Sequence, residues 1–445
     1  MLVRLFIYTI CLCFVGKLYS QSQYVLPDDI SYDKIDFEMI NNVILIPVEV
    51  NGLQLKFLLD TGVSKPIVFN FLKASDSLQI LNAEKIEVRG LGNGSNLQAL
   101  RSSHNVFKIG EAVNKDQAFF AVFDPDLNFA PKLGKAIDGI IGYDVFKDFV
   151  VQIDYNKKHI KIYKPERFKY KNCKKYQSFD LTFNYNKPFL SAKVDLESKK
   201  NIPVNMLLDS GSSDAIWLFE NDKKQIVVGT NYFTDYLGAG LSGSVYGKRS
   251  KIEALKLGDF VIKNPKVAFP DLLTVSSVQS FYDRNGSLGG EILKRFNCIF
   301  DYPNSKLYLK PNSNFRAPFS YNKSGLLVEH SGVRMVMEID PYNNPTISFS
   351  DRYHVNVSGV IKSNYRYQLK PTYVIYQIVP DSPAEKSGLL IGDRIVAINK
   401  KLTENMSLDK LNSYFFQESG QILQIKVDRN GFERQFKLTL KSPLE

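Results

Sequence analysis

The chain contains two copies of one module, and this duplication limits the folds that it can adopt. Asp60 follows the apolar run FLL and precedes Thr-Gly, while Asp209 follows MLL and precedes Ser-Gly. The stretch DGIIGYDVFKDFVVQIDY, from Asp138, corresponds to NGSLGGEILKRFNCIFDY, from Asn285, and a pair of Gly-rich stretches lies between these landmarks. All of them recur in the same order at a spacing of about 150 residues, which indicates a repeated structural unit. We expect the two modules at 21–165 and 166–315.

Each module has the sequence pattern of β-strands joined by tight turns. The first contains VILIPVEV, the turn Asn-Gly and then LQLKFLLD, which is a hairpin signature. The second contains FLSAKVDL, a polar stretch and then IPVNMLLD. Only short pieces such as DVFKDF and GEILKRF have helical periodicity. The fold class is therefore expected to be mostly β, with two pseudo-symmetric lobes built as barrels or sandwiches.

The charge of the chain does not by itself indicate a nucleic-acid partner. The 445 residues carry a net charge of +11, but the Lys and Arg residues are thinly spread. The densest basic stretch, KYKNCKK at 169–175, falls at the expected junction between the modules, where a solvated linker is the simpler interpretation. A nucleic-acid binder remains a weak alternative that rests on net charge alone, and we expect no nucleic-acid partner.

The N-terminus has the pattern of a secretory signal peptide. Arg4 precedes the apolar run LFIYTICLCFV, and small polar residues follow it, which predicts a signal peptide over 1–20. An uncleaved anchor is the alternative, although the run is short for a membrane span. The mature chain would then be exported to a periplasmic, cell-surface or secreted location. It would keep Cys173 and Cys298, and the sequence leaves open whether they form a disulfide.

Two acids placed in duplicated turns suit a reaction that needs both an acid and a base. A single Asp at a strand end usually forms a turn by bonding nearby amides. Two carboxyl groups close together in a low dielectric cannot both ionise easily, so they share one proton. One member of such a pair can activate a water molecule while the other polarises a carbonyl. Asp60 and Asp209 are therefore the candidate catalytic pair.

The motifs LLDTG, LLDSGSS, GIIG and GSLGG resemble those of the aspartic proteases, of the bilobed pepsin and retroviral-protease type. The resemblance covers about two thirds of the chain, and it implies that Asp60 and Asp209 form the catalytic dyad. It also implies that neighbouring residues support the dyad loops: Thr61, Gly62, Ser210, Gly211, Ile141, Gly142, Leu288 and Gly289. Gly-rich hairpins are placed like flaps over a substrate, with hinge candidates at Gly92, Gly94, Gly240 and Gly243; surface turns are the alternative.

The chain departs from the family pattern at two positions. Val63 stands where the family usually has Ser or Ala, and Ser287 occupies a position that is usually apolar. Neither departure removes a carboxylate, so activity stays the favoured interpretation.

The C-terminal part, over 316–445, resembles a PDZ domain. The resemblance rests on SPAEKSGLLIGDRIVAIN, from Ser382, followed by an amphipathic helix that starts near Ser407 and a hairpin with an Asn-Gly turn. A PDZ domain implies peptide capture by strand addition, with a backbone nest for a terminal carboxylate. The candidate nest residues are Ser324, Gly325 and Leu326, ahead of a long insert at about 338–371. The alternative is a domain that packs on the lobes and binds no ligand.

The sequence offers no other catalytic or cofactor pattern. The four His residues are scattered without metal-ligand spacing, so we expect neither a metal nor a cofactor. No His or Cys is placed to serve a nucleophilic triad. The favoured function is therefore an aspartic endopeptidase that uses Asp60 and Asp209, with a peptide or protein as its substrate. The alternative is an inactive peptide-binding protein that uses the same cleft and the PDZ domain.

Overall fold

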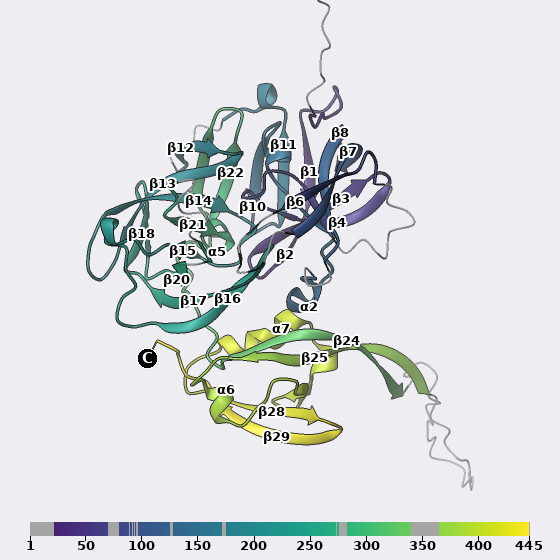
Figure 1. The fold of residues 1–445 in the computed structure, drawn as a ribbon, viewed down its shortest axis with the longest axis vertical. Coiled ribbons are helices and arrows are strands. Elements are labelled where there is room, and N and C mark those ends of the chain that lie inside the picture. The colour runs from purple at the N-terminus through teal and green to yellow at the C-terminus, as the bar shows by residue number, and fades with distance from the viewer. Residues whose placement is uncertain are drawn as a thin grey trace, which may run out of the picture. The chain divides into compact units, whose positions relative to one another are not determined.

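The structure is a computed structural model, and it shows a mostly β protein (Figure 1). It describes residues 22–69, 80–88, 90, 92, 94, 97–124, 128–170, 175–272, 274–275, 283–339 and 365–444. The predicted signal peptide, Cys173 and the middle of the predicted insert lie outside the described residues. In the described part, no helix has both the length and the apolar character needed to cross a membrane.

The chain divides into two compact units. Unit 1 comprises Met1–Leu127, Ile137–Gly229 and Tyr236–Ala317, and unit 2 comprises Asn128–Ala136, Thr230–Asp235 and Pro318–Glu445. Two short segments from the duplicated region thus belong to the C-terminal unit.

The first repeat in unit 1 forms an eight-stranded sheet. Its order is β2-β3-β4-β9-β5-β8-β7-β6. These strands are β2 (Glu38–Ile40), β3 (Val43–Val50), β4 (Leu53–Leu59), β9 (Gly139–Ile141), β5 (Ile67–Phe69), β8 (Ala112–Val122), β7 (Leu97–Ile109) and β6 (Glu84–Val88). The predicted hairpin is confirmed, because β3 pairs antiparallel with β4 around Asn51 and Gly52, which both have positive φ. Most side chains of β3 and the last three of β4 are buried in the core of this lobe.

The two repeats meet in a larger sheet of fifteen strands, whose main order is β1-β11-β10-β22-β23-β12-β13-β14-β21-β15-β20-β17-β16. Its first part contains β1 (Tyr32–Asp36), β11 (His159–Tyr163), β10 (Val150–Asp154), β22 (Phe296–Asp301) and β23 (Lys306–Pro311). Strands β10 and β22, which occupy equivalent places in the two repeats, pair with each other antiparallel. This pairing joins the two repeats within unit 1.

The rest of this sheet is the second repeat. It contains β12 (Gln177–Asn184), β13 (Lys187–Asp195), β14 (Ile202–Asp209), β21 (Gly286–Gly289), β15 (Ile216–Leu218), β20 (Lys266–Pro270), β17 (Gly243–Lys251) and β16 (Phe233–Gly240), with β18 (Ala254–Leu257) and β19 (Phe260–Lys263) off the main path. The two short helices predicted in the repeats are confirmed as α3 (Tyr143–Phe146) and α5 (Gly290–Leu293). Cys298 is a free, buried thiol in β22, and burial raises its pKa.

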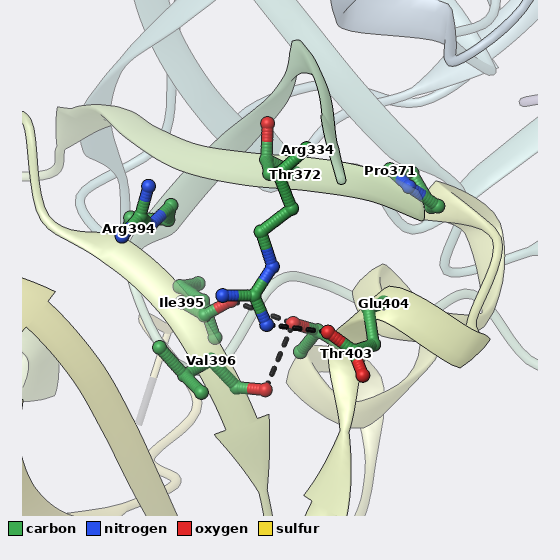
Figure 2. A pocket seen from close by; sticks show the side chains of 8 residues that line it. All are labelled: Arg334, Pro371, Thr372, Arg394, Ile395, Val396, Thr403 and Glu404. Atoms are coloured by element: carbon green, nitrogen blue, oxygen red, sulfur yellow. Dashed lines mark hydrogen bonds and ion pairs between the residues drawn. The ribbon is translucent and has the colours of Figure 1, made fainter. Parts of the chain in front are cut away.

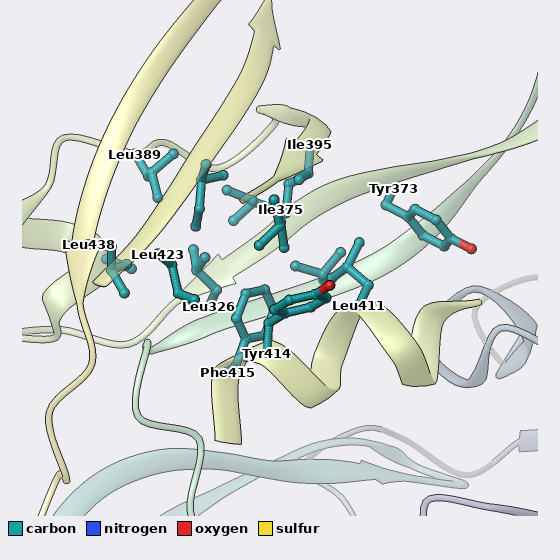
Figure 3. Close-up of a cluster of buried hydrophobic side chains, with 14 of the residues drawn as sticks. Leu326, Tyr373, Ile375, Leu389, Ile395, Leu411, Tyr414, Phe415, Leu423 and Leu438 are labelled. Atoms are coloured by element: carbon teal, nitrogen blue, oxygen red, sulfur yellow. The ribbon is translucent and has the colours of Figure 1, made fainter. Parts of the chain in front are cut away.

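Unit 2 contains a sheet in the order β24-β25-β26-β28-β29. Its elements are β24 (Leu326–Ile339), β25 (Tyr365–Ile378), α6 (Pro383–Lys386), β26 (Arg394–Ile398), α7 (Leu408–Ser413), β28 (Ile422–Arg429) and β29 (Phe432–Thr439). The predicted helix near Ser407 is confirmed, since the Ser407 hydroxyl oxygen accepts a bond from the Lys410 N–H as an N-cap. The buried core of unit 2 is formed by side chains from the sheet, which pack against Leu411 of α7 and against Phe415 just after that helix (Figure 3).

Strands β24 and β25 continue as a pair beyond the rest of the sheet of unit 2. The predicted insert was expected to begin near residue 338, but β24 and β25 stay paired from Met335–Leu369 to Ile339–Tyr365. One face carries exposed apolar side chains, among them Met335, Tyr367 and Leu369. On the other face, Glu338 forms ion pairs with Arg366 and Lys370. The strand pattern continues because the polar and apolar residues alternate.

A small cavity in unit 2 is lined by residues of β24, β25 and β26 and by Thr403 and Glu404 (Figure 2). The Thr403 hydroxyl donates to the Ile395 carbonyl at 2.6 Å, and Arg334 pairs with Glu404 beside it. The cavity holds about 10 Å³, which is room for about one water molecule. We therefore assign it no ligand.

Candidate active site

Asp60 lies at the end of a buried strand, where a neighbouring parallel strand holds its backbone. It follows β4 directly, and β4 pairs parallel with β9 through Leu59 and Ile141. The Asp60 N–H donates to the Ile141 carbonyl at 2.8 Å. A Cβ on Gly142 would lie only 1.9 Å from the Asp60 carbonyl oxygen, so the close approach of these loops requires glycine there.

Asp209 is held in the same way in the second repeat. Strand β14, which ends at Asp209, pairs parallel with β21, with Leu208 opposite Leu288 and Asp209 opposite Gly289. The Gly289 N–H donates to the Ala215 carbonyl at 2.9 Å. The structure therefore brings each acid and its predicted supporting residues together.

The two loops are joined to each other by four buried hydrogen bonds, called here the interlock. The Thr61 hydroxyl donates to the Leu208 carbonyl at 2.8 Å, and its oxygen accepts from the Ser210 N–H at 3.0 Å. In the reverse direction, the Ser210 hydroxyl donates to the Leu59 carbonyl at 2.8 Å and accepts from the Thr61 N–H at 3.0 Å. Each hydroxyl group therefore both donates and accepts a bond across the interlock, and each one fixes the opposite acid's loop.

The glycine of each triplet faces the carboxyl groups. A Cβ on Gly62 would lie 3.1 Å from Asp60 Oδ1 and 3.5 Å from Asp209 Oδ1, so both oxygens converge on one point. A Cβ on Gly211 would lie 2.4 Å from Asp60 Cγ. Any larger residue at Gly211 would collide with Asp60. The two glycines thus permit the close approach of the acids that the sequence predicts.

The shared environment of the two acids raises the pKa of both. Burial is the main cause for Asp60, and the charge of Asp209 adds to it, which raises the pKa of Asp60 to about 7. Burial also raises the pKa of Asp209, against the opposing charges of Arg284 and Lys187. A pair of this kind retains one proton up to near-neutral pH. One carboxyl group can therefore donate a proton while the other accepts one.

Sequence reasoning missed the cations beside this pair. Lys187 begins β13 after the tight turn Tyr185-Asn186, and Arg284 lies just before β21; both interact with Asp209. The Ser64 hydroxyl donates to the Tyr185 carbonyl at 2.7 Å, which ties that turn to the Asp60 loop. No local pattern distinguishes Lys187 from a surface lysine in such a turn. Its role follows only from the pairing of distant strands.

The predicted flap tips from the two repeats meet in unit 1. The Gly94 N–H donates to the Ser242 carbonyl at 2.6 Å, and the Gly90 N–H donates to the Ser242 hydroxyl oxygen at 3.0 Å. Gly240 ends β16 and Gly243 begins β17, so both flank this contact. A Cβ on Gly92, which has a φ of +128°, would lie 2.4 Å from the Ser242 carbonyl carbon. The motion of the two flap tips over a substrate remains a prediction.

We expect Gly92→Ala to weaken the contact between these tips. The new Cβ would collide with the Ser242 backbone, so the bond from Gly94 N–H should open more often. Amide hydrogen exchange in fragments that contain Gly94 should become about tenfold faster. Gly238→Ala is the matched control, because Gly238 also has a positive φ but no atom within 4 Å of its Cβ position. Equal protection in both variants would contradict the prediction.

The two departures from the family pattern fit the observed backbone. The Val63 carbonyl accepts a bond from the Tyr143 N–H at 3.1 Å, so the loop after Asp60 keeps its link to α3. Ser287 lies buried in β21 between Leu207 and Trp217 on the neighbouring strands. Neither residue displaces an acid.

The predicted nest residues of unit 2 form a tight turn whose amides already have partners. The Ser324 and Gly325 N–H groups donate to Asn322 Oδ1 at 3.0 and 3.2 Å. The Leu326 N–H donates to Ser324 Oγ at 2.9 Å. A terminal carboxylate would have to compete with these bonds, and its binding here remains a prediction.

Comparison with known families agrees with this arrangement. The family described as aspartyl protease matches in two segments, residues 46–145 and 192–292, which contain Asp60 and Asp209 respectively. The family described as PDZ domain matches residues 374–429. No curated protein matches the chain. The chain thus carries an aspartyl protease domain in two segments, followed by a C-terminal PDZ domain.

Proposed function

We propose that the protein is an endopeptidase that hydrolyses peptide bonds with a water molecule activated between Asp60 and Asp209. One observation carries the proposal: two buried acids, one from each repeat, have carboxyl oxygens within 3.5 Å of the same position beside Gly62, and burial there raises the pKa of both. The ionised carboxylate removes a proton from water, and the protonated carboxyl donates to the carbonyl oxygen of the substrate. No covalent intermediate is needed, because water attacks directly.

Lys187 and Arg284 would affect this chemistry through their positive charges. Both oppose the effect of burial on the pKa of Asp209, and Lys187 does so for Asp60 as well. They therefore help one carboxyl group of the pair to remain ionised while the other is protonated. That division of roles is what acid–base catalysis by two carboxyl groups requires.

The proposal is tested by peptide cleavage. The purified protein, expressed without residues 1–20, should cut internal bonds in a mixed peptide library at acidic pH and lose this activity as the pH rises above about 7, because the pair then gives up its shared proton. A pepstatin-type inhibitor, whose hydroxyl group mimics the tetrahedral intermediate, should suppress cleavage by competing with the peptides. Mass spectrometry of the products provides the measurement. Peptide binding without any cleavage over this range would instead support the inactive binding protein.

The PDZ domain and the N-terminus complete the proposal. We propose that the PDZ domain captures a peptide, as strand-adding domains of this kind do. Export to a periplasmic, cell-surface or secreted location is proposed from the signal-peptide pattern of residues 1–20. N-terminal sequencing of protein secreted by the native host would reveal the cleavage site.

A further inference from the structure

The outer edge of β24 is the natural place for a peptide to join unit 2. Strand β24 ends the sheet order, so none of the strands that the structure describes pairs with its other side. Such an edge presents backbone donors and acceptors to which an extended peptide can add. Helix α7 lies against β24 and forms one side of this edge. Here we call the region formed by the first residues of β24 and the start of α7 the β24–α7 edge.

A segment of the first repeat already lies at this edge. Residues 128–136 belong to unit 2, and their single helical turn, α2 (Ala130–Leu133), contacts β24 (Figure 1). The Lys132 ammonium lies 5.4 Å from the ring centre of Tyr376. Tyr376 follows Ile375, the partner of Val328, so this contact lies near the beginning of β24.

The same segment also reaches α7. Gly134 ends α2 with a φ of +70°, and its N–H donates to the Ala130 carbonyl at 2.8 Å. A Cβ on Gly134 would lie 2.9 Å from the Cβ of Leu408, the first residue of α7. The charge of Lys135 acts on the neighbouring residue, Asp409, and lowers its pKa against the larger effect of burial. The segment therefore spans both sides of the β24–α7 edge.

The contact between residues 128–136 and the β24–α7 edge is shallow, so this segment can be displaced. None of the residues of α2 is fully buried, so the contact removes little apolar surface from water. The Leu133 and Gly134 N–H groups donate within the turn, to Phe129 and Ala130. A helical turn cannot extend the sheet as a strand does, so an extended peptide has backbone bonds to gain.

From these contacts we infer that residues 128–136 are the resident occupant of the β24–α7 edge, and that a free peptide binds there only by displacing them. The occupant continues directly into unit 1, because Asp138 and β9 follow it and the Ile141 carbonyl of β9 holds the Asp60 N–H. A peptide captured by the PDZ domain would therefore release residues 128–136. These residues lead into β9, the strand that supports the Asp60 loop.

The test measures peptide binding by the full chain. The probe is a fluorescent synthetic peptide with the sequence of residues 126–137, DLNFAPKLGKAI. In the wild type, the resident segment should block the probe. In Gly134→Val, the new side chain collides with Leu408, so the segment should leave and the probe should bind at least tenfold more tightly.

Two further variants make the result specific. Gly52→Val is the matched control: Gly52 has a φ of +87° but nothing within 4 Å of its Cβ position, so the probe should bind as weakly as to the wild type. A second release variant, Lys132→Glu with Lys135→Glu, replaces the cations that face Tyr376 and Asp409 and should also admit the probe. Circular dichroism confirms that each variant is folded.

The inference is overturned if the wild type binds the probe as tightly as Gly134→Val does, or if neither folded release variant binds it. A scrambled peptide should bind to none of these proteins. The assay detects binding and not cleavage, so its result is independent of the proposed peptidase activity.

Discussion

Replacing Asp60 or Asp209 by asparagine is expected to lower kcat for peptide cleavage by roughly 10³-fold or more. Asparagine keeps the shape of the side chain but can neither accept a proton from water nor pass one to the carbonyl group. KM should change little, since the loops and their interlock remain. Asp36→Asn is the control, because the Asp36 side chain is 77% exposed and should not affect the rate. Cleavage at the wild-type rate by either dyad variant would refute the proposed mechanism.

The Asp60→Asn variant should also be more stable than the wild type near neutral pH. Asp60 has an ordinary pKa of 3.8 when unfolded and about 7 when folded, so the folded state holds the proton more tightly. The contribution of the Asp60 carboxyl group to stability is therefore fully present below pH 3.8 and is lost as the pH rises towards 7. At 1.36 kcal/mol for each pKa unit, the loss is on the order of 4 kcal/mol.

This second expectation is checked by urea unfolding at several pH values. The free energies of unfolding of Asp60→Asn and the wild type should coincide near pH 3.5, and the difference should grow to its full size at pH 7. Asp36→Asn should follow the wild type throughout. A constant difference at all pH values would mean that burial of the Asp60 carboxyl is not its cause.

The positions of the two acids could be predicted because the catalytic chemistry requires a recognisable local sequence pattern. An Asp that ends an apolar strand before a Gly turn is unusual, and its repetition at Asp60 and Asp209 indicates a shared function. The supporting strands β9 and β21 were predictable for the same reason, as they are duplicated too. The two repeats could be compared with each other, as related sequences are compared in an alignment, and this comparison identified the shared positions.

The surroundings of the acids could not be predicted, because they come from contacts between distant residues. Lys187 stands in a turn that resembles any exposed hairpin, and only the folded structure brings it to Asp209. Residues 128–136 likewise show no pattern that predicts membership of the C-terminal unit. The extension of β24 and β25 was missed because its apolar residues remain exposed, while sequence patterns assign such residues to a core.

Loss of one hydroxyl group from the interlock is expected to destabilise unit 1 by roughly 3 kcal/mol. Thr61→Val keeps the shape of the side chain but leaves the buried Ser210 N–H and Leu208 carbonyl without their bonds to Thr61. Ser210→Ala does the same to the Thr61 N–H and the Leu59 carbonyl. Urea unfolding measures the effect, and Thr61→Ser, which keeps the hydroxyl group, should recover most of the lost stability.

The interlock variants should also lose activity, although they retain both acids. The four bonds join the loop of Asp60 to the loop of Asp209, so breaking two of them lets the carboxyl groups move apart. A displacement of about 1 Å can lower a catalytic rate by about 10²-fold. The effect should appear mainly in kcat, with Thr61→Ser close to the wild type. If Thr61→Val were as stable and active as Thr61→Ser, the hydroxyl bonds would not be what holds the dyad together.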